Sequence, residues 1–338
     1  MRIAVVVLNW NGAHLLQEFL PSVVTHSKEA TIYVADNAST DNSLVVLDKE
    51  FPTITCIKFD SNNGYAGGYN KALANLEEDL FILLNSDVKV SANWLKPIQD
   101  AFINNPKLMA AQPKILDYKN PSFFEYAGAA GGYIDALGYP FCRGRIFMAL
   151  EKDLGQYNNK TDIFWASGAC LAVTRNAFIQ ANGFDEDLFA HHEEIDLCWR
   201  MQHLGGQIIY IPESVVYHLG GATLQKANPQ KTFYNFRNTL LLLLKNVKGP
   251  HVYGLLCLRL FLDGIAGVKF LIEGDGFHTI AVIKSHLSFY SLFPKYLKKR
   301  KHTAKRFQYA STFSVVWQYF ICKRKTYNTL KILSKTPK

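Results

Sequence analysis

The stretch IAVVVLNWNG (residues 3–12) decides the fold. Six apolar residues, four of them β-branched, precede Asn9, Trp10, Asn11 and Gly12. An apolar run of this length that ends in polar and turn-forming residues is typical of a strand buried on both faces of a sheet. The run is too short for a signal peptide and lacks a cleavage site. We therefore expect a buried first strand whose carboxyl end carries polar groups.

The first ninety residues repeat this pattern. Apolar or β-branched runs recur at residues 31–35, 55–59 and 80–84. Segments with helical spacing separate the runs, at residues 13–24, 42–50 and 68–76. Such alternation predicts an α/β fold, with a mostly parallel sheet flanked by helices on both faces. Ligands of such sheets bind beyond the carboxyl ends of the strands.

Polar residues or glycines follow every one of these runs: Asn9, Asn11, Gly12, Asp36, Asn63, Gly64, Asn85, Ser86 and Asp87. No G-x-G-x-x-G follows the first run, which argues against a dinucleotide cofactor bound in the usual way. The glycines of NNGYAGGYN (residues 62–70) either let a ligand approach the backbone closely or simply form a turn before a helix. Asn85 and Asp87 either form a turn or offer oxygen ligands that suit Mg²⁺ or Mn²⁺.

The segment FAHHEEIDLCWR (residues 189–200) concentrates charge. His191 and His192 are adjacent, so a helix would point them about 100° apart, which argues against a shared metal ion. Acidic residues suit the first turn of a helix, and Asp196 stands four residues before Arg200, the spacing of a helical ion pair. An ordinary helix start and the working end of an enzyme both remain open from these residues alone.

Composition sets the class of protein. The chain has 338 residues, 49% hydrophobic and 19% charged, which is enough for a large core and excludes a disordered chain. Its six cysteines are scattered and include no C-x-x-C pair. This pattern implies neither a disulfide framework nor a zinc site, and it favours a reducing, cytoplasmic compartment.

The positive charge belongs to the C-terminal part. The net charge is +9, yet residues 1–275 hold 23 basic and 28 acidic residues, a net charge of −5. After Asp275 there are 14 basic residues and no acidic one. Such a stretch, interleaved with aromatic residues, favours an anionic membrane surface over nucleic acid, for which no motif is present.

The most apolar part of this region is residues 252–272. Arg259, Asp263 and Lys269 interrupt it, and charge at the centre of a membrane span is costly. On a helical wheel the three charges lie within about 120° of one another. This predicts a helix that lies in the membrane interface with its charged face toward water.

Six motifs carry a resemblance to a known family: VVLNWNG, VADNASTDNS, NNGYAGGYNKAL, LLNSDV, SGACLAVTR and GFDEDLFAHHEEIDLCWR. In order and spacing they resemble the inverting glycosyltransferases of family 2, which have a GT-A fold, and most closely the bacterial rhamnosyltransferase and galactofuranosyltransferase branch. The resemblance covers roughly residues 1–240. It implies a nucleotide-binding half (1–115) and an acceptor-binding half (116–240), followed by a helical, basic, membrane-associating region (241–338).

The resemblance also implies roles for the strand-end residues. Asp36 matches the acid that binds the pyrimidine base, and the remaining nucleotide-sugar contacts fall on Asn9, Asn11, Gly12, Asn63, Gly64, Asn85 and Ser86. Asp87 matches the metal-binding acid of the family's D-x-D motif. The first acid of that motif is Asn85 here, so only one carboxylate is left for the Mn²⁺ or Mg²⁺ ion. His218 stands where the family often supplies a further metal ligand.

Catalytic and acceptor roles follow in the same way. Glu194 matches the catalytic base, which is normally an aspartate, and Glu193 is the rival. The sugar and acceptor pocket would include Trp165, Gly168, His191 and His192. For Trp165, stacking on a sugar competes with the alternative of a core tryptophan packed beside glycine.

The function implied is metal-dependent, inverting transfer of a sugar from dTDP-rhamnose or a UDP-sugar. The acceptor would be a hydroxyl of a glycan or lipid-linked molecule in cell-surface polysaccharide synthesis. The protein would work as a peripheral protein on the cytoplasmic face of the cell membrane. The alternative is a non-catalytic membrane adaptor that binds nucleotide sugars.

Overall fold

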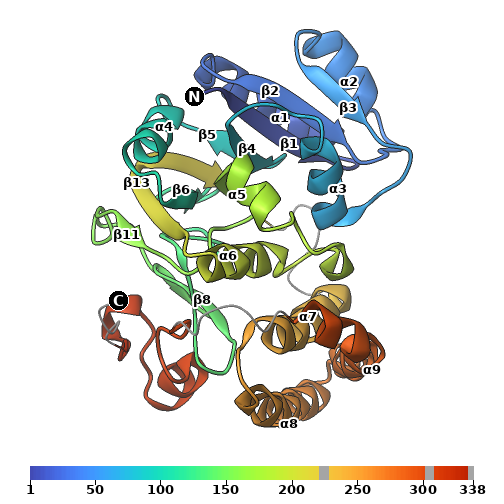
Figure 1. Cartoon of the computed structure of the whole chain (residues 1–338), viewed down its shortest axis with the longest axis vertical. Coiled ribbons are helices and arrows are strands. Elements are labelled where there is room, and N and C mark those ends of the chain that lie inside the picture. The colour runs from blue at the N-terminus through green and yellow to red at the C-terminus, as the bar shows by residue number, and fades with distance from the viewer. Residues whose placement is uncertain (221–227, 301–307, 334–338) are drawn as a thin grey trace.

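The computed structural model describes residues 1–220, 228–300 and 308–333, and Figure 1 shows the course of the chain. The strands are β1 (Ile3–Asn9), β2 (Thr31–Asp36), β3 (Thr55–Lys58), β4 (Leu80–Asn85), β5 (Val88–Val90), β6 (Leu108–Asp117), β7 (Gly132–Ile134), β8 (Pro140–Cys142), β9 (Arg145–Ile146), β10 (Ala149–Leu150), β11 (Thr161–Asp162), β12 (Cys170–Thr174) and β13 (Gln207–His218). The helices are α1 (Ala13–His26), α2 (Ser43–Glu50), α3 (Gly64–Leu73), α4 (Leu95–Asn104), α5 (Arg175–Gln180), α6 (Glu193–His203), α7 (Pro229–Asn246), α8 (His251–Ile272) and α9 (Gly276–Lys299), with short turns η1 (Glu186–Leu188), η2 (Trp317–Ile321) and η3 (Tyr327–Thr329).

A mostly parallel sheet organises the fold, as the alternating pattern predicts. Its strand order is β11-β13-β6-β12-β4-β1-β2-β3, and β5 pairs with β13. Strands β1 to β4 are parallel, as are β6 and β13, and β12 is antiparallel to both β4 and β6. Strands β1 to β4, β6 and β13 therefore all point the same way, and their carboxyl ends share one edge of the sheet.

Both faces of this sheet are covered, because alternate side chains of a strand point to opposite faces. In β1, Ile3, Val5 and Val7 join one core with helices α1, α2 and α4. Ala4 and Val6 face the other core, which includes residues of α3, α5, α6 and α7. This arrangement explains why the strand is apolar along its whole length.

The observed elements follow the predicted ones closely in the first ninety residues. The largest difference is α3, which begins at Gly64 instead of residue 68. Gly64 has a φ of +66°, so the glycine-rich segment turns and enters the helix at once.

The C-terminal helices lie at the end of the molecule's long axis opposite α1 and α2 (Figure 1). Helix α7 runs across residue 240, where the two predicted regions meet, and its residues 240–244 are buried in the core. Helices α8 and α9 follow and pack on α7 and on each other. In the described ranges, no helix has the length and apolar character needed to cross a membrane.

The orientation of α8 differs from the prediction that its charged face is turned toward water. Arg259 and Asp263 are buried and form an ion pair across 3.2 Å. The Arg259 guanidinium also lies over the ring of Tyr139 and donates to the carbonyl of Leu137. Because the rest of the fold supplies these partners, the charged face packs inward, and of the three predicted charges only Lys269 is exposed.

Candidate active site

The polar strand ends meet at the shared edge of the sheet, as expected. Asn9 and Asp36 end β1 and β2, Asn85 ends β4, and His218 ends β13. Because β12 runs in the opposite direction, its amino end, with Gly168 just before it, lies at this edge too. The edge therefore brings together residues that are far apart in the sequence.

Asn9 and Asp36 form a buried link between β1 and β2. The Asn9 amide donates to Oδ1 of Asp36 across 3.0 Å, and the Ser39 backbone N–H donates to Oδ2. Asp36 is 1% exposed. Asn11, which is exposed, accepts from the Thr40 backbone with its side-chain oxygen. Each Asp36 oxygen has a lone pair left for a further hydrogen bond. The two bonds described come from Asn9 and Ser39.

The glycine-rich segment packs against another part of the chain, at Phe189. A Cβ on Gly64 would lie 2.6 Å from the ring of Phe189, so glycine is required there. The next two backbone N–H groups, of Tyr65 and Ala66, donate to the Phe189 carbonyl across 2.9 and 3.2 Å. Asn63 is anchored by Asn37, which accepts from its backbone N–H. The close approach predicted for a ligand is thus made by Phe189.

The two predicted metal ligands are in contact. Nε2 of His218 lies 3.1 Å from Oδ1 of Asp87 and 3.4 Å from the Asn85 amide nitrogen. On the other side of the ring, Nδ1 of His218 lies 3.3 Å from Oε1 of Glu125. Burial opposes a charged imidazole, but Asp87 and Glu125 outweigh it and raise the pKa of His218 well above its usual range. The same histidine keeps the pKa of Asp87 low despite burial.

This donor set fits a divalent ion bound through few protein ligands. Oδ1 of Asp87 and, in the neutral form of His218, Nε2 lie side by side and offer one oxygen and one nitrogen ligand. Glu125 lies beside Nδ1, the other ring nitrogen, and is placed to orient the imidazole. No group of three or more metal-binding side chains occurs in the parts of the chain that the structure describes. A bound ion would therefore complete its coordination with diphosphate oxygens and water.

Glu193 and Glu194 begin α6 and are both short of hydrogen-bond donors. Oε2 of each is buried without a hydrogen-bond partner among the described residues. Burial and the neighbouring charge of Glu194 raise the pKa of Glu193 well above its usual range. Burial raises the pKa of Glu194 to about 7. The pKa of Glu194, at about 7, suits a general base at neutral pH, and Glu193 holds its proton more tightly than an ordinary glutamate does.

Shared neighbours connect these glutamates with the other parts of the site. Burial raises the pKa of Cys142 to about 11, and the charges of both Glu125 and Glu194 add to the shift. Burial raises the pKa of Tyr65, on the glycine-rich segment, and the charges of Glu193 and Glu194 raise it further. The Tyr65 hydroxyl donates to the carbonyl of Gly168. Cys142 and Tyr65 therefore lie within electrostatic range of the carboxyl pair, and Tyr65 links the glycine-rich segment to Gly168.

The loop before the glutamates has a strained backbone. Phe189, His191 and His192 have positive φ angles of 61°, 67° and 70°. Such angles are uncommon for residues other than glycine and require support from their surroundings. Burial lowers the pKa of His191 to about 4 and of His192 to about 3, so both imidazoles are neutral at pH 7.

Helix α7 supplies that support through Asn238. Its side-chain amide donates to the carbonyls of Leu188, Ala190 and His191 across 3.0, 3.0 and 2.6 Å. Arg237, the preceding residue, donates to the Leu188 carbonyl as well. Sequence reasoning did not find these residues or Glu125, because no local motif marks them.

Asp196 has a structural role, as its spacing from Arg200 predicts. It accepts from Arg200 across 2.8 Å, from Lys245 across 2.9 Å and from Asn246 across 2.8 Å. Burial opposes its ionisation, but Arg200 and Lys245 outweigh burial and hold the pKa of Asp196 far below its usual range. This network ties α6 to α7.

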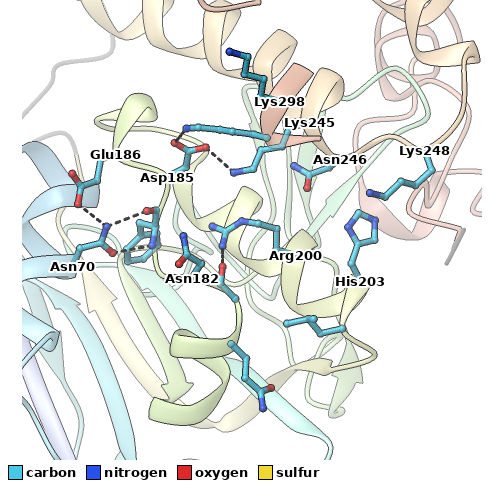
Figure 2. Close-up of a pocket in the computed structure, with 15 residues that line it drawn as sticks. Asn70, Asn182, Asp185, Glu186, Arg200, His203, Lys245, Asn246, Lys248 and Lys298 are labelled. Carbon is cyan, nitrogen blue, oxygen red and sulfur yellow. Dashed lines mark hydrogen bonds and ion pairs between the residues drawn. The ribbon is translucent and has the colours of Figure 1, made fainter. Parts of the chain in front are cut away.

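A cavity of about 620 Å³ lies beside this network (Figure 2). Asn70, Asp185, Arg200, Lys245 and Lys299 are among the residues that line it. The predicted site residues are not part of its lining. Its cations largely pair with Asp185 and Asp196, so we assign the chemistry to the edge of the sheet.

Trp165 and Gly168, which were predicted to contact a sugar, pack against other residues of the protein. Trp165 is 3% exposed, and its indole N–H donates to the Tyr133 carbonyl across 2.9 Å. Its ring fills the space beside Gly132. The space beside Gly168 is taken by the Tyr65 hydroxyl, 2.8 Å from where a Cβ would stand. Both positions are therefore explained by packing within the protein.

Comparison with known proteins identifies the family. The model of the family described as Glycosyl transferase family 2 matches residues 4–179, more than half of the chain. The chain belongs to glycosyl transferase family 2. Among curated family relatives, it is 27% identical over 229 residues to the N-acetylglucosaminyl-diphospho-decaprenol L-rhamnosyltransferase of Mycobacterium tuberculosis, covering 63% of this chain and 75% of that protein. It is 34% identical over 58 residues to the rhamnosyltransferase WbbL of Escherichia coli K12, covering 17% of this chain and 22% of that protein.

Solved structures of other glycosyltransferases share the fold. The mannosyltransferase PcManGT from Pyrobaculum calidifontis, in complex with GDP-Man and Mn²⁺, aligns with a TM-score of 0.53 and 15% identity over 86% of this chain and 87% of that one. GalNAc-T7 with UDP, GalNAc and Mn²⁺ aligns with a TM-score of 0.52 and 18% identity over 64% of this chain and 43% of that one. The family and these neighbours together establish the chain as a glycosyltransferase with an α/β, GT-A-like fold.

Proposed function

We propose that this family 2 enzyme transfers a sugar with inversion from a nucleotide sugar to a hydroxyl of a lipid-linked or glycan acceptor in cell-surface polysaccharide synthesis. The observation that carries the proposal is the contact between Asp87 and His218 at the sheet edge. The carboxyl pair Glu193 and Glu194 at the start of α6 supplies the candidate base. dTDP-rhamnose is the leading donor, because the curated relatives include the rhamnosyltransferases of Mycobacterium tuberculosis and Escherichia coli. A UDP-sugar is the next candidate.

The chemistry needs one base and one leaving group. The oxygen of the acceptor hydroxyl attacks the anomeric carbon, and Glu194 accepts the proton of that hydroxyl. The bond from that carbon to the nucleotide diphosphate breaks on the opposite face, and the diphosphate leaves with the electron pair. A Mn²⁺ or Mg²⁺ ion held by Asp87 and His218 would neutralise charge on the leaving diphosphate. Glu193, whose pKa is raised by burial and by the charge of Glu194, orients the acceptor.

The nucleotide is assigned to the first half of the edge. Asn11, Gly12, Asn63, Gly64 and Ser86 lie with Asn9, Asp36 and Asn85 around the ends of the parallel strands. His191 and His192, both neutral, belong to the acceptor side. The acceptor chemistry proposed here also places the enzyme at the cytoplasmic face of the membrane as a peripheral protein.

A panel of nucleotide sugars tests the proposal. The protein is mixed with each donor and Mn²⁺, and release of nucleoside diphosphate is measured with and without a short polyprenyl-diphosphate sugar acceptor. We expect one donor to give acceptor-dependent, EDTA-sensitive release and a product of inverted anomeric configuration by NMR. A retained configuration, or release that is equally fast in EDTA, would overturn it.

A further inference from the structure

The hairpin of α8 and α9 has an unusual distribution of side chains. The buried ion pair of Arg259 (3% exposed) and Asp263 (1% exposed) points inward. Lys269 and Glu273, at the end of α8, form an exposed ion pair. His286 of α9 lies on the same inner side, 3.6 Å from Asp263. The two helices are joined there by a hydrogen bond from the Thr279 hydroxyl to the Gly267 carbonyl.

The outward side of the hairpin is apolar instead. The outer apolar face consists of Tyr253, Leu258, Phe261, Ile265, Val268, Leu271, Ile272, Phe277, Ile280, Ile283, Leu287 and Tyr290, all exposed. Phe261 and Phe277 are 67% and 78% exposed. A contiguous apolar surface of this kind on a monomer marks an interaction surface, because water is a poor solvent for it.

Charge identifies the occupant. After Asp275 the chain carries no acidic residue. Lys284 and Lys298 of α9 are exposed, whereas Lys295 and Lys299 form ion pairs with Asp185 and Asp187. If two copies met through the outer apolar face about a twofold axis, the lysines of one α9 would approach those of the other, which is unfavourable. An anionic lipid surface accepts both the apolar side chains and the lysines.

A second apolar and basic segment lies at the same end of the molecule. Phe313, Trp317, Phe320 and Ile321 are exposed, and basic residues 323–325 follow them directly. Figure 1 shows this segment and α8 together at the end of the long axis farthest from α1 and α2.

We propose that the outer apolar face of the α8–α9 hairpin inserts into the interfacial layer of an anionic membrane, with the exposed Lys284 and Lys298 of α9 among the lipid headgroups. This inference rests on the proposed function, which requires the enzyme to reach a lipid-linked acceptor. It differs from the sequence expectation, in which the charged side of residues 252–272 faces water. The inward ion pair leaves the apolar side for the membrane.

Vesicle co-sedimentation of the full-length protein tests the proposal. The variant Phe261→Glu/Leu271→Glu places two charges in the outer apolar face, at positions 67% and 62% exposed. The matched control Ile103→Glu/Ile179→Glu changes two residues that are 57% and 59% exposed on α4 and α5. All four side chains are exposed, so circular dichroism and thermal melting should match those of the wild-type protein.

We expect the wild type and the control to bind phosphatidylglycerol vesicles and the Phe261→Glu/Leu271→Glu variant to bind about tenfold or more weakly. Lys284→Gln/Lys298→Gln should weaken binding to these vesicles and reduce its sensitivity to salt. Equal binding of wild type and the Phe261→Glu/Leu271→Glu variant would overturn the proposal. A wild-type dimer by light scattering that this variant dissociates, without vesicle binding, would overturn it in favour of a contact between two copies.

Donor turnover separates this inference from the proposed function. Transfer to a short, water-soluble acceptor should be unchanged in the Phe261→Glu/Leu271→Glu variant, whereas transfer to an acceptor embedded in vesicles should fall with binding. If no donor is turned over by any form of the protein, the proposed function fails, and the vesicle result still decides the docking surface.

Discussion

Nε2 of His218 lies 3.1 Å from Oδ1 of Asp87, although β13 and the turn after β4 are far apart in the chain. The pairing of β13 with β5, which sets His218 opposite Val88, brings them together. Asp87→Ala should therefore abolish Mn²⁺-dependent activity, and His218→Ala should weaken Mn²⁺ binding by about 10- to 100-fold. Calorimetric titration of Mn²⁺ and turnover in EDTA check this. Asp100→Ala, an exposed carboxylate on α4, is the control, and full activity of Asp87→Ala in EDTA would refute the assignment.

The two glutamates at the start of α6 can be told apart by their amide variants. Glu194→Gln removes the proton acceptor without changing the shape of the side chain, so kcat should fall by about 10²- to 10⁴-fold with donor affinity retained. Glu193→Gln should lose less, because Glu193 orients the acceptor and does not take its proton. Glu194→Asp should keep partial activity. Steady-state kinetics and donor titration measure these effects, and an inactive Glu193→Gln beside a normal Glu194→Gln would make Glu193 the base.

The pH dependence of the reaction should report Glu194. Burial raises its pKa to about 7, and a general base works in its deprotonated form, so kcat should rise with pH through about 7 and then level off. The folded state binds this proton more tightly than the unfolded chain does. Its stabilising contribution is therefore complete below the ordinary glutamate pKa and is lost as pH rises through about 7. Glu194→Gln should raise the melting temperature at pH 8 and abolish the rise of kcat with pH. An unchanged dependence of kcat on pH in Glu194→Gln would contradict the assignment.

Asp196 should matter for stability and not for chemistry. Asp196→Asn breaks a buried ion pair with Arg200 and Lys245, and we expect the free energy of unfolding to fall by about 3–5 kcal/mol. The depressed pKa means that the carboxylate stabilises the fold above the ordinary aspartate pKa, and this contribution is lost as pH falls below it. Urea unfolding at pH 7 and pH 3 measures both effects. Asp100→Asn is the exposed control, and equal losses in the two variants would count against the network.

Asn238 should affect catalysis from outside the reacting groups. Asn238→Ala removes the donor to three loop carbonyls, and we expect a loss of about 1–3 kcal/mol in stability together with a lower kcat. Donor affinity should fall less than kcat, because the loop precedes the base directly and reaches the glycine-rich segment only through Phe189. Thermal melting, kcat and donor titration measure the three quantities. Asn235→Ala, one turn earlier on α7, is the control; a kcat equal to the wild type in Asn238→Ala would show that the loop holds its shape unaided.

Local patterns were sufficient to predict the first half of the fold. The apolar run before Asn9 and its repeats are set by burial on both faces of the sheet, so periodicity alone locates β1 to β4. The polar strand ends converge because parallel strands share an edge. The acidic start of α6 and the pair of Asp196 with Arg200 also follow from spacing along one helix.

Contacts between distant segments could not be predicted in this way. Glu125 and Asn238 act through partners on other elements, and nothing in their own neighbourhood marks them. Gly168 and Trp165 were expected at a sugar, but Tyr65 and Tyr133 take up their space and their hydrogen-bonding groups. The orientation of α8 depends on Tyr139 and Leu137, which a helical wheel does not include.

The bonds from Asn238 to the loop before Glu193 also impose an order on how the protein is made. During synthesis, β1 to β4 and β12 leave the ribosome well before α7, so the nucleotide-facing edge can assemble first. Three left-handed residues in the loop cost about 1–3 kcal/mol each, and their support arrives only with Asn238. The strand edge can therefore form before the loop that precedes Glu193 has the hydrogen bonds that support its backbone.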